Sequence, residues 1–109
     1  MTFYLNVRNK FPIKEEGGNM CTRVAVMAIV VDKPDSTGKL NSLLHDYGDY
    51  IIGRMGIPYK SKNISIVSVA IDAPQDTISS LAGKLGNIDG ISVKTAYSNV
   101  YGTSDGKNI

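Results

Sequence analysis

Two hydrophobic patterns alternate along the chain, and they predict strands and helices in a definite order. Residues 22–31 are almost continuously apolar, which is typical of a strand whose two faces both require cover. Residues 64–71 repeat this pattern, and residues 91–97 alternate apolar and polar side chains as a half-buried strand does. Residues 50–59 also favour a strand, although two glycines interrupt them.

Between these strands, apolar side chains recur every three or four residues, which is the spacing of one face of a helix. The first such face comprises Leu40, Leu43, Leu44 and Tyr47, and the second comprises Ile78, Leu81, Ala82 and Leu85. Gly48 and Gly86 follow these faces, so we expect the two helices to end there.

The order strand, helix, strand, strand, helix, strand is that of an α+β, ferredoxin-like βαββαβ fold. Right-handed crossovers then place both helices on one face of a four-stranded antiparallel sheet. Because the first and third strands are apolar on both sides, the second sheet face also needs cover. We expect a second copy of the chain to supply it, in a homo-oligomer such as a dimer or tetramer. A monomer with an unusually apolar sheet face is the alternative.

The two ends of the chain differ in composition from this predicted domain, which spans residues 21–98. Residues 1–20 form an N-terminal extension that we expect to be a poorly ordered terminus. Phe3, Leu5 and Val7 alternate with other residues, so one short strand is an alternative, and so are residues upstream of a natural start at Met20. Residues 99–109 are polar and glycine-rich, which predicts a solvated tail.

Composition removes several classes of function. The 109 residues carry a net charge of +2, with one Cys and one His. One Cys cannot form an intramolecular disulfide, and a monomer cannot assemble four zinc ligands from such a set, so we expect no metal or cofactor. The charge is too small and dispersed to indicate direct nucleic-acid binding. No apolar run reaches the ~20 residues that span a bilayer, so no membrane partner and a cytoplasmic location are expected.

The residues with reactive side chains do not form a catalytic pattern. His45 lies on the predicted polar side of a helix, Cys21 precedes a strand, and Asp46 and Asp49 lie at a helix end. Each is explained most simply as a solvated or inert group. Because no acid–base pair or nucleophile–base spacing stands out, we predict no catalytic residues and a protein that is not an enzyme.

The segment Gly53-Arg54-Met55-Gly56 is the least ordinary in the sequence, because glycine weakens a strand interior. The glycines could form a bulge that fits the sheet to a neighbouring subunit. They could also open space for a small ligand, with Arg54 as a planar donor to an anionic group. On the second interpretation the ligand-binding residues are Gly53, Arg54, Met55, Gly56, Tyr47 and Tyr50.

Three segments carry a resemblance to a known family: residues 45–59, 64–74 and 78–98, with GDYIIGRMG at 48–56 the most distinctive. They resemble small ACT-like proteins described as regulators of iron-only hydrogenase systems. The resemblance covers residues 22–98. It implies a ferredoxin-like fold similar to the C-terminal domain of nickel-responsive repressors, an oligomer, and a regulatory role in hydrogenase maturation or expression, including transcription regulation.

Two properties of the nickel-responsive repressors are not expected here. Their metal site uses several His and a Cys on the sheet, whereas this chain offers only His45 and Cys21. Their ribbon-helix-helix DNA-binding domain is also too long for residues 1–20. We therefore expect a regulatory module that acts through ligand binding or a protein partner. The alternative is a structural protein-interaction module with no small ligand.

Overall fold

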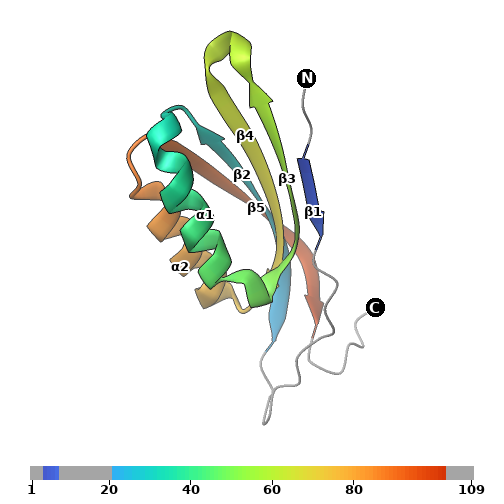
Figure 1. Cartoon of the computed structure of the whole chain (residues 1–109). Helices are drawn as coiled ribbons and strands as arrows, with labels where there is room; N and C mark the ends of the chain where they lie inside the picture. The colour runs from blue at the N-terminus through green and yellow to red at the C-terminus, as the bar shows by residue number, and fades with distance from the viewer. Residues whose placement is uncertain (1–3, 8–20, 103–109) are drawn as a thin grey trace.

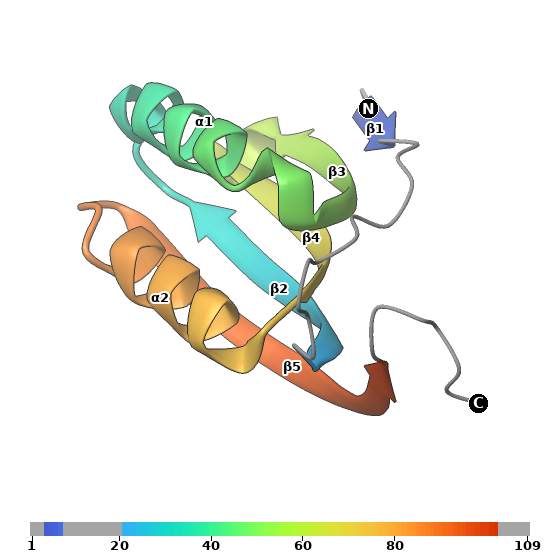
Figure 2. The ribbon, with the colours of Figure 1, turned by 90° about the horizontal axis from the view of Figure 1, so that it is seen from below.

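A computed structural model describes residues 4–7 and 21–102 of the chain, and it confirms the α+β ferredoxin-like fold. The predicted order appears as β2 (Thr22–Val31), α1 (Thr37–Asp46), β3 (Ile51–Tyr59), β4 (Ile64–Ala73), α2 (Gln75–Gly86) and β5 (Ile91–Gly102). All strand pairs are antiparallel, and both helices cover the same face of the sheet (Figures 1 and 2).

The sheet has a fifth strand beyond the four that the hydrophobic pattern predicts. Strand β1 (Tyr4–Val7) pairs with β3, so the strand order is β1-β3-β4-β2-β5. The sequence offers such a strand only as an alternative to a poorly ordered terminus; the rest of residues 1–20 lies outside the described residues, as do residues 103–109. Strand β5 continues to Gly102, past Tyr97 where the sequence pattern ends it, because its final residues still pair with the start of β2.

The hydrophobic core lies between the two helices and one face of the sheet. Alternate side chains of β2 are buried there, and so are the matching residues of β4: Ala25, Met27, Ile29 and Val31 with Val67, Val69 and Ile71. Helix α1 contributes Leu40 and Leu44, and α2 contributes Ile78, Leu81 and Leu85. The two predicted helical faces are thus confirmed, with Leu43, Tyr47 and Ala82 partly buried at their margins.

The ends of the helices are set by local hydrogen bonds more than by left-handed glycines. Helix α1 ends at Asp46, and Gly48 begins a 3-10 turn (Gly48–Tyr50) in which Tyr50 N donates to Tyr47 O. Among the described residues the one glycine with positive φ is Gly90, at 87°. Gly48 therefore follows the helix without adopting the left-handed conformation that glycine often takes at helix C-termini.

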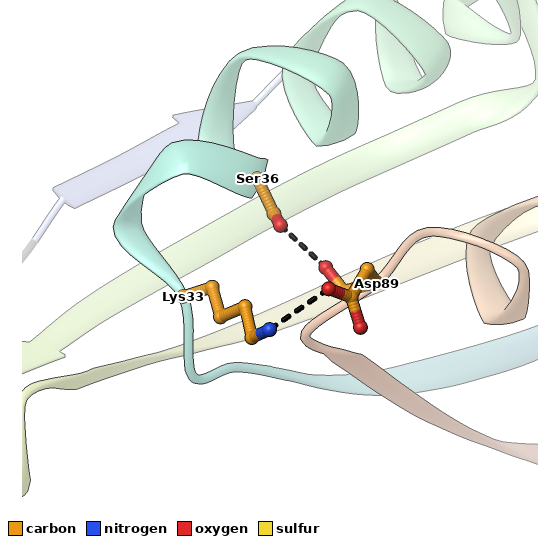
Figure 3. Close-up of polar contacts among 3 residues, drawn as sticks. All are labelled: Lys33, Ser36 and Asp89. Carbon is orange, nitrogen blue, oxygen red and sulfur yellow. Dashed lines mark hydrogen bonds and ion pairs between the residues drawn. The ribbon is translucent and has the colours of Figure 1, made fainter.

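Gly90 lies where the loop before α1 meets the loop after α2. Lys33 Nζ donates to Asp89 Oδ2 at 2.8 Å, and the Ser36 hydroxyl donates to the Asp89 carbonyl (Figure 3). The hydrogen bond to Lys33, more than its charge, lowers the pKa of the Asp89 carboxyl. A Cβ added at Gly90 would lie 2.7 Å from the Lys33 Cβ, so both the backbone angle and the close approach require glycine.

We expect Gly90→Ala to lower the free energy of unfolding by about 1–3 kcal/mol, because it forces a side chain into a left-handed conformation against Lys33. Gly83→Ala is the matched control, since Gly83 lies exposed in α2 with open space around its Cβ position. It should raise stability by about 0.5–1 kcal/mol. Urea unfolding at one protein concentration measures both, and equal effects would contradict this explanation of Gly90.

Candidate functional site

The segment Gly53-Arg54-Met55-Gly56 lies in β3, next to one side of helix α1. The pairing of β3 with β4 shifts register between Ile51 and Gly53, which is the bulge that the glycines suggested. Beyond the bulge, Arg54 pairs with Val69 and Gly56 with Val67, and both partners belong to the buried core. Arg54 and Gly56 are therefore on the side of the sheet that faces the helices.

Arg54 forms a bridge between β3 and α1. Its Nη2 donates to Asn41 Oδ1 at 2.8 Å. A cavity lies on each side of this bridge: one of about 370 Å³ toward His45 and Gly48, and one of about 400 Å³ toward Gly56 and Pro58. The hydrogen bond thus divides one groove along the edge of α1 into two compartments. No Cβ fills the space above Gly56, where the second compartment opens.

The Nε atom of Arg54 is buried and has no hydrogen-bond partner among the described residues. Arg23 shows the usual arrangement: its Nε donates to Ser98 O at 2.9 Å and its Nη1 to Gln75 Oε1 at 2.8 Å. A buried N–H without an acceptor costs about 1–3 kcal/mol, and more when the group is charged. Arg54 is therefore a cation that the surrounding protein satisfies only in part.

The structure brings together some of the residues that the sequence selected for a ligand and separates others. Gly53 and Arg54 line the first cavity, and Gly56 lines the second. Met55 pairs with Ser68 and lies on the opposite face of the sheet. Tyr50 is 39% exposed, and its ring lies 6.5 Å from that of Tyr47, outside both cavity walls.

Two residues of the groove, Asn41 and His45, are absent from the sequence-based ligand set. They are four residues apart on α1, so they project from the same side of the helix and line the first cavity together. That spacing was visible in the sequence. The missing information was the position of β3, which places Arg54 opposite this side of α1.

A second polar cluster joins the two helices at the surface. Lys84 Nζ donates to Tyr47 Oη at 2.9 Å and lies 5.3 Å from the centre of the Tyr47 ring. The Ser80 hydroxyl is 3.2 Å from the same oxygen. The hydrogen bond from Lys84 is the main cause that lowers the pKa of the Tyr47 phenol, because a cationic donor favours the phenolate.

We expect the pKa of the Tyr47 phenol to lie below its ordinary value, and Lys84→Met to bring it back toward that value. An acid whose pKa is lowered by folding adds stability only where it is ionised, so any effect on stability belongs to alkaline pH. Titration of ¹³C-labelled tyrosine followed by NMR measures the Tyr47 phenol in the unmodified protein and in the variant. An unchanged Tyr47 titration in Lys84→Met would show that this contact is absent in solution.

The described residues offer few other candidates. In residues 4–7 and 21–102 no three His, Cys, Asp or Glu side chains come together as a metal site. No helix in those ranges is long and apolar enough to cross a membrane. Cys21 is exposed at the start of β2.

The fold defines the chain as a small ferredoxin-like domain with an added edge strand, and comparison with known proteins then gives its family. Residues 23–95 match the TM1266-like family, described as iron-only hydrogenase system regulators, and the chain belongs to this family. The uncharacterized protein TM1266 from Thermotoga maritima is 36% identical, with a TM-score of 0.67 over 70% of this chain and 96% of that one.

A more distant structure shares the fold alone. A formyltetrahydrofolate deformylase from Pseudomonas putida KT2440 is 11% identical, with a TM-score of 0.53 over 70% of this chain and 29% of that one. No curated protein matches the sequence. The N-terminal strand β1 lies outside the region that the family shares, which begins at residue 23.

Proposed function

We propose that this protein is a small oligomeric regulatory module of an iron-only hydrogenase system, which acts by binding a ligand or a protein partner and not by catalysis. The description of its family supports the regulatory role. We infer the oligomer from the apolar character of the open sheet face. This face is the side of β3, β4, β2 and β5 that the helices do not cover (Figure 2).

The open sheet face is apolar across its centre. One row of neighbours runs across the strands from Ile57 through Ile66 and Val30 to Ser92. Ile66 is 40% exposed and Val30 36%, and Val26, two rows further along β2, is 44% exposed. The row between them carries Met55, Ser68, Ala28 and Lys94. Isolated exposed apolar residues are ordinary, but a contiguous set over three strands is typical of an interface.

The outer strand limits this surface. On β5 the same face carries Ser92 and Lys94, and on β4 it carries Ser68 between Ile66 and Ala70, so its exposed apolar side chains are concentrated on β2 and at Ile66. A face that is apolar at its centre and polar at its rim is suited to contact with a second sheet. A second copy would bring an identical surface, which permits a two-fold contact between equivalent strands. The module would then respond to a ligand or partner by a change in this assembly or in the surfaces that it presents.

We expect the protein to sediment as a dimer or tetramer at micromolar concentration, and Val26→Lys to weaken this association at least ~100-fold. The introduced ammonium would be buried against an apolar surface without an acceptor. Ser79→Lys is the control, because it adds the same charge on the exposed side of α2, away from the open sheet face. Its sedimentation should equal that of the unmodified protein.

A monomer at the highest concentration tested would contradict the oligomer, and so would a Val26→Lys variant that assembles normally. Circular dichroism of both variants shows whether the fold is retained. A charge at an exposed strand position such as Val26 leaves the buried face of β2 unchanged.

A further inference from the structure

We propose that the cavity between α1 and β3 binds a small organic carboxylate, with Arg54 as the principal donor to it. The cavity comprises the first compartment described above, lined on its polar side by Arg54, Asn41 and His45. This inference deepens the proposed function and rests on it, since it gives the regulatory module a class of ligand and a site.

The free hydrogen-bonding capacity of Arg54 matches a carboxylate. Its Nη2 gives one hydrogen to Asn41, and Nε gives its hydrogen to no described residue. The Nε–H and the second Nη2 hydrogen lie along one edge of the guanidinium, the edge that binds both oxygens of a carboxylate in parallel. Because Nε is shielded from solvent, we expect a small rotation of the side chain as the carboxylate enters.

The remaining polar groups favour an anion over a cation. Asn41 and His45 lie one helical turn apart, so the His45 ring can donate an N–H toward a group held by Arg54. None of the residues that line this cavity is acidic, and Arg54 is the permanently charged residue among them. A carboxylate would therefore add the acceptor that Arg54 lacks and would meet no charge of its own sign in the cavity walls.

The other side of the cavity is apolar, and this limits the body of the ligand. Leu44 and Ile51 line the cavity with the small part of each side chain that the core leaves uncovered, 2% and 6%. Gly48 and Gly53 contribute backbone and no side chain to the wall. At about 370 Å³ the cavity is near the lower end of small-molecule sites, which run to about 300–1,000 Å³. A short aliphatic carboxylate fits these features, whereas inorganic phosphate would leave the apolar side without a contact.

Strand β1 supports the strand that carries the donor. It pairs with β3 along Gly53 to Gly56, with Asn6 in register with Arg54. Strand β3 is therefore paired along both of its edges at this segment, with β1 on one and β4 on the other. Such support holds the Arg54 backbone in one position, which reduces the ordering cost of binding.

The test is an NMR titration of the methyl-labelled full chain with straight-chain carboxylates from acetate to hexanoate. We expect the methyl signals of Leu44 and Ile51 to shift, with about three- to fourfold tighter binding for each added methylene until the cavity is filled. We expect roughly millimolar affinity for a ligand of butyrate's size, so titration to ~10 mM is sufficient. Butylamine, which carries the opposite charge, and inorganic phosphate serve as comparison ligands.

Variants assign the site. Arg54→Ala should weaken binding by a factor on the order of 10–100, because a charge-assisted pair of hydrogen bonds is lost. Arg54→Lys keeps the charge and should still lose most of the affinity, since an ammonium group cannot donate two parallel hydrogen bonds to a carboxylate as a guanidinium does. Lys62→Gln is the matched control: it removes one positive charge at the turn between β3 and β4 and should bind as the unmodified protein does.

Several results would overturn the proposal. They are an absence of shifts with every carboxylate, equal binding of butylamine, binding of phosphate without dependence on chain length, or retained affinity in Arg54→Ala. Sedimentation of the same samples separates this failure from failure of the proposed function. An oligomer that binds no carboxylate would leave the assembly in place and favour a module that uses a protein partner alone. A monomer that binds carboxylates would keep the site and remove the oligomer.

Discussion

The packing of α1 and α2 against one face of the sheet is the constraint on which the other features depend. It buries alternate residues of β2 and β4, and it anchors the helices by Leu40 and Leu44 on one and Leu81 and Leu85 on the other. The domain has two helices and five strands, so no further helix is available for the second face among the described residues. That face keeps its valines and isoleucines exposed, which is the physical basis of the proposed assembly.

The same packing decides where Arg54 is placed. Helix α1 lies over the part of the sheet formed by β3 and β4 (Figure 2), and the bulge after Ile51 sets which β3 side chains face it. Arg54 then meets Asn41 at the edge of the helix, where the core ends and a groove begins. A cation at such an edge has hydrophobic residues on one side and an open space on the other, which is an arrangement suited to an amphipathic ligand.

Much of the fold could be predicted from the sequence because its periodicities are strong. Both helical faces agree with the buried leucines, and the apolar runs of residues 22–31 and 64–71 became the central strands. The pattern was weaker at the ends. Strand β5 extends beyond Tyr97 because Tyr101 and Gly102 find backbone partners in β2, a pairing that polar composition does not reveal. Helix α1 ends at Asp46, and Gly48 begins a 3-10 turn in which Tyr50 N donates to Tyr47 O.

By itself, the sequence determined the order of strands and helices, the excess of apolar strand residues and the unusual glycine-flanked Arg54, because each is a property of neighbouring residues. The tertiary structure decided which residues meet Arg54. Tyr47 turns toward Lys84 and Met55 lies on the opposite face of the sheet, while Asn41 and His45 line the cavity. These contacts depend on the register of β3 against β4 and on the position of α1 over the sheet, and both are set by packing between segments distant in the sequence.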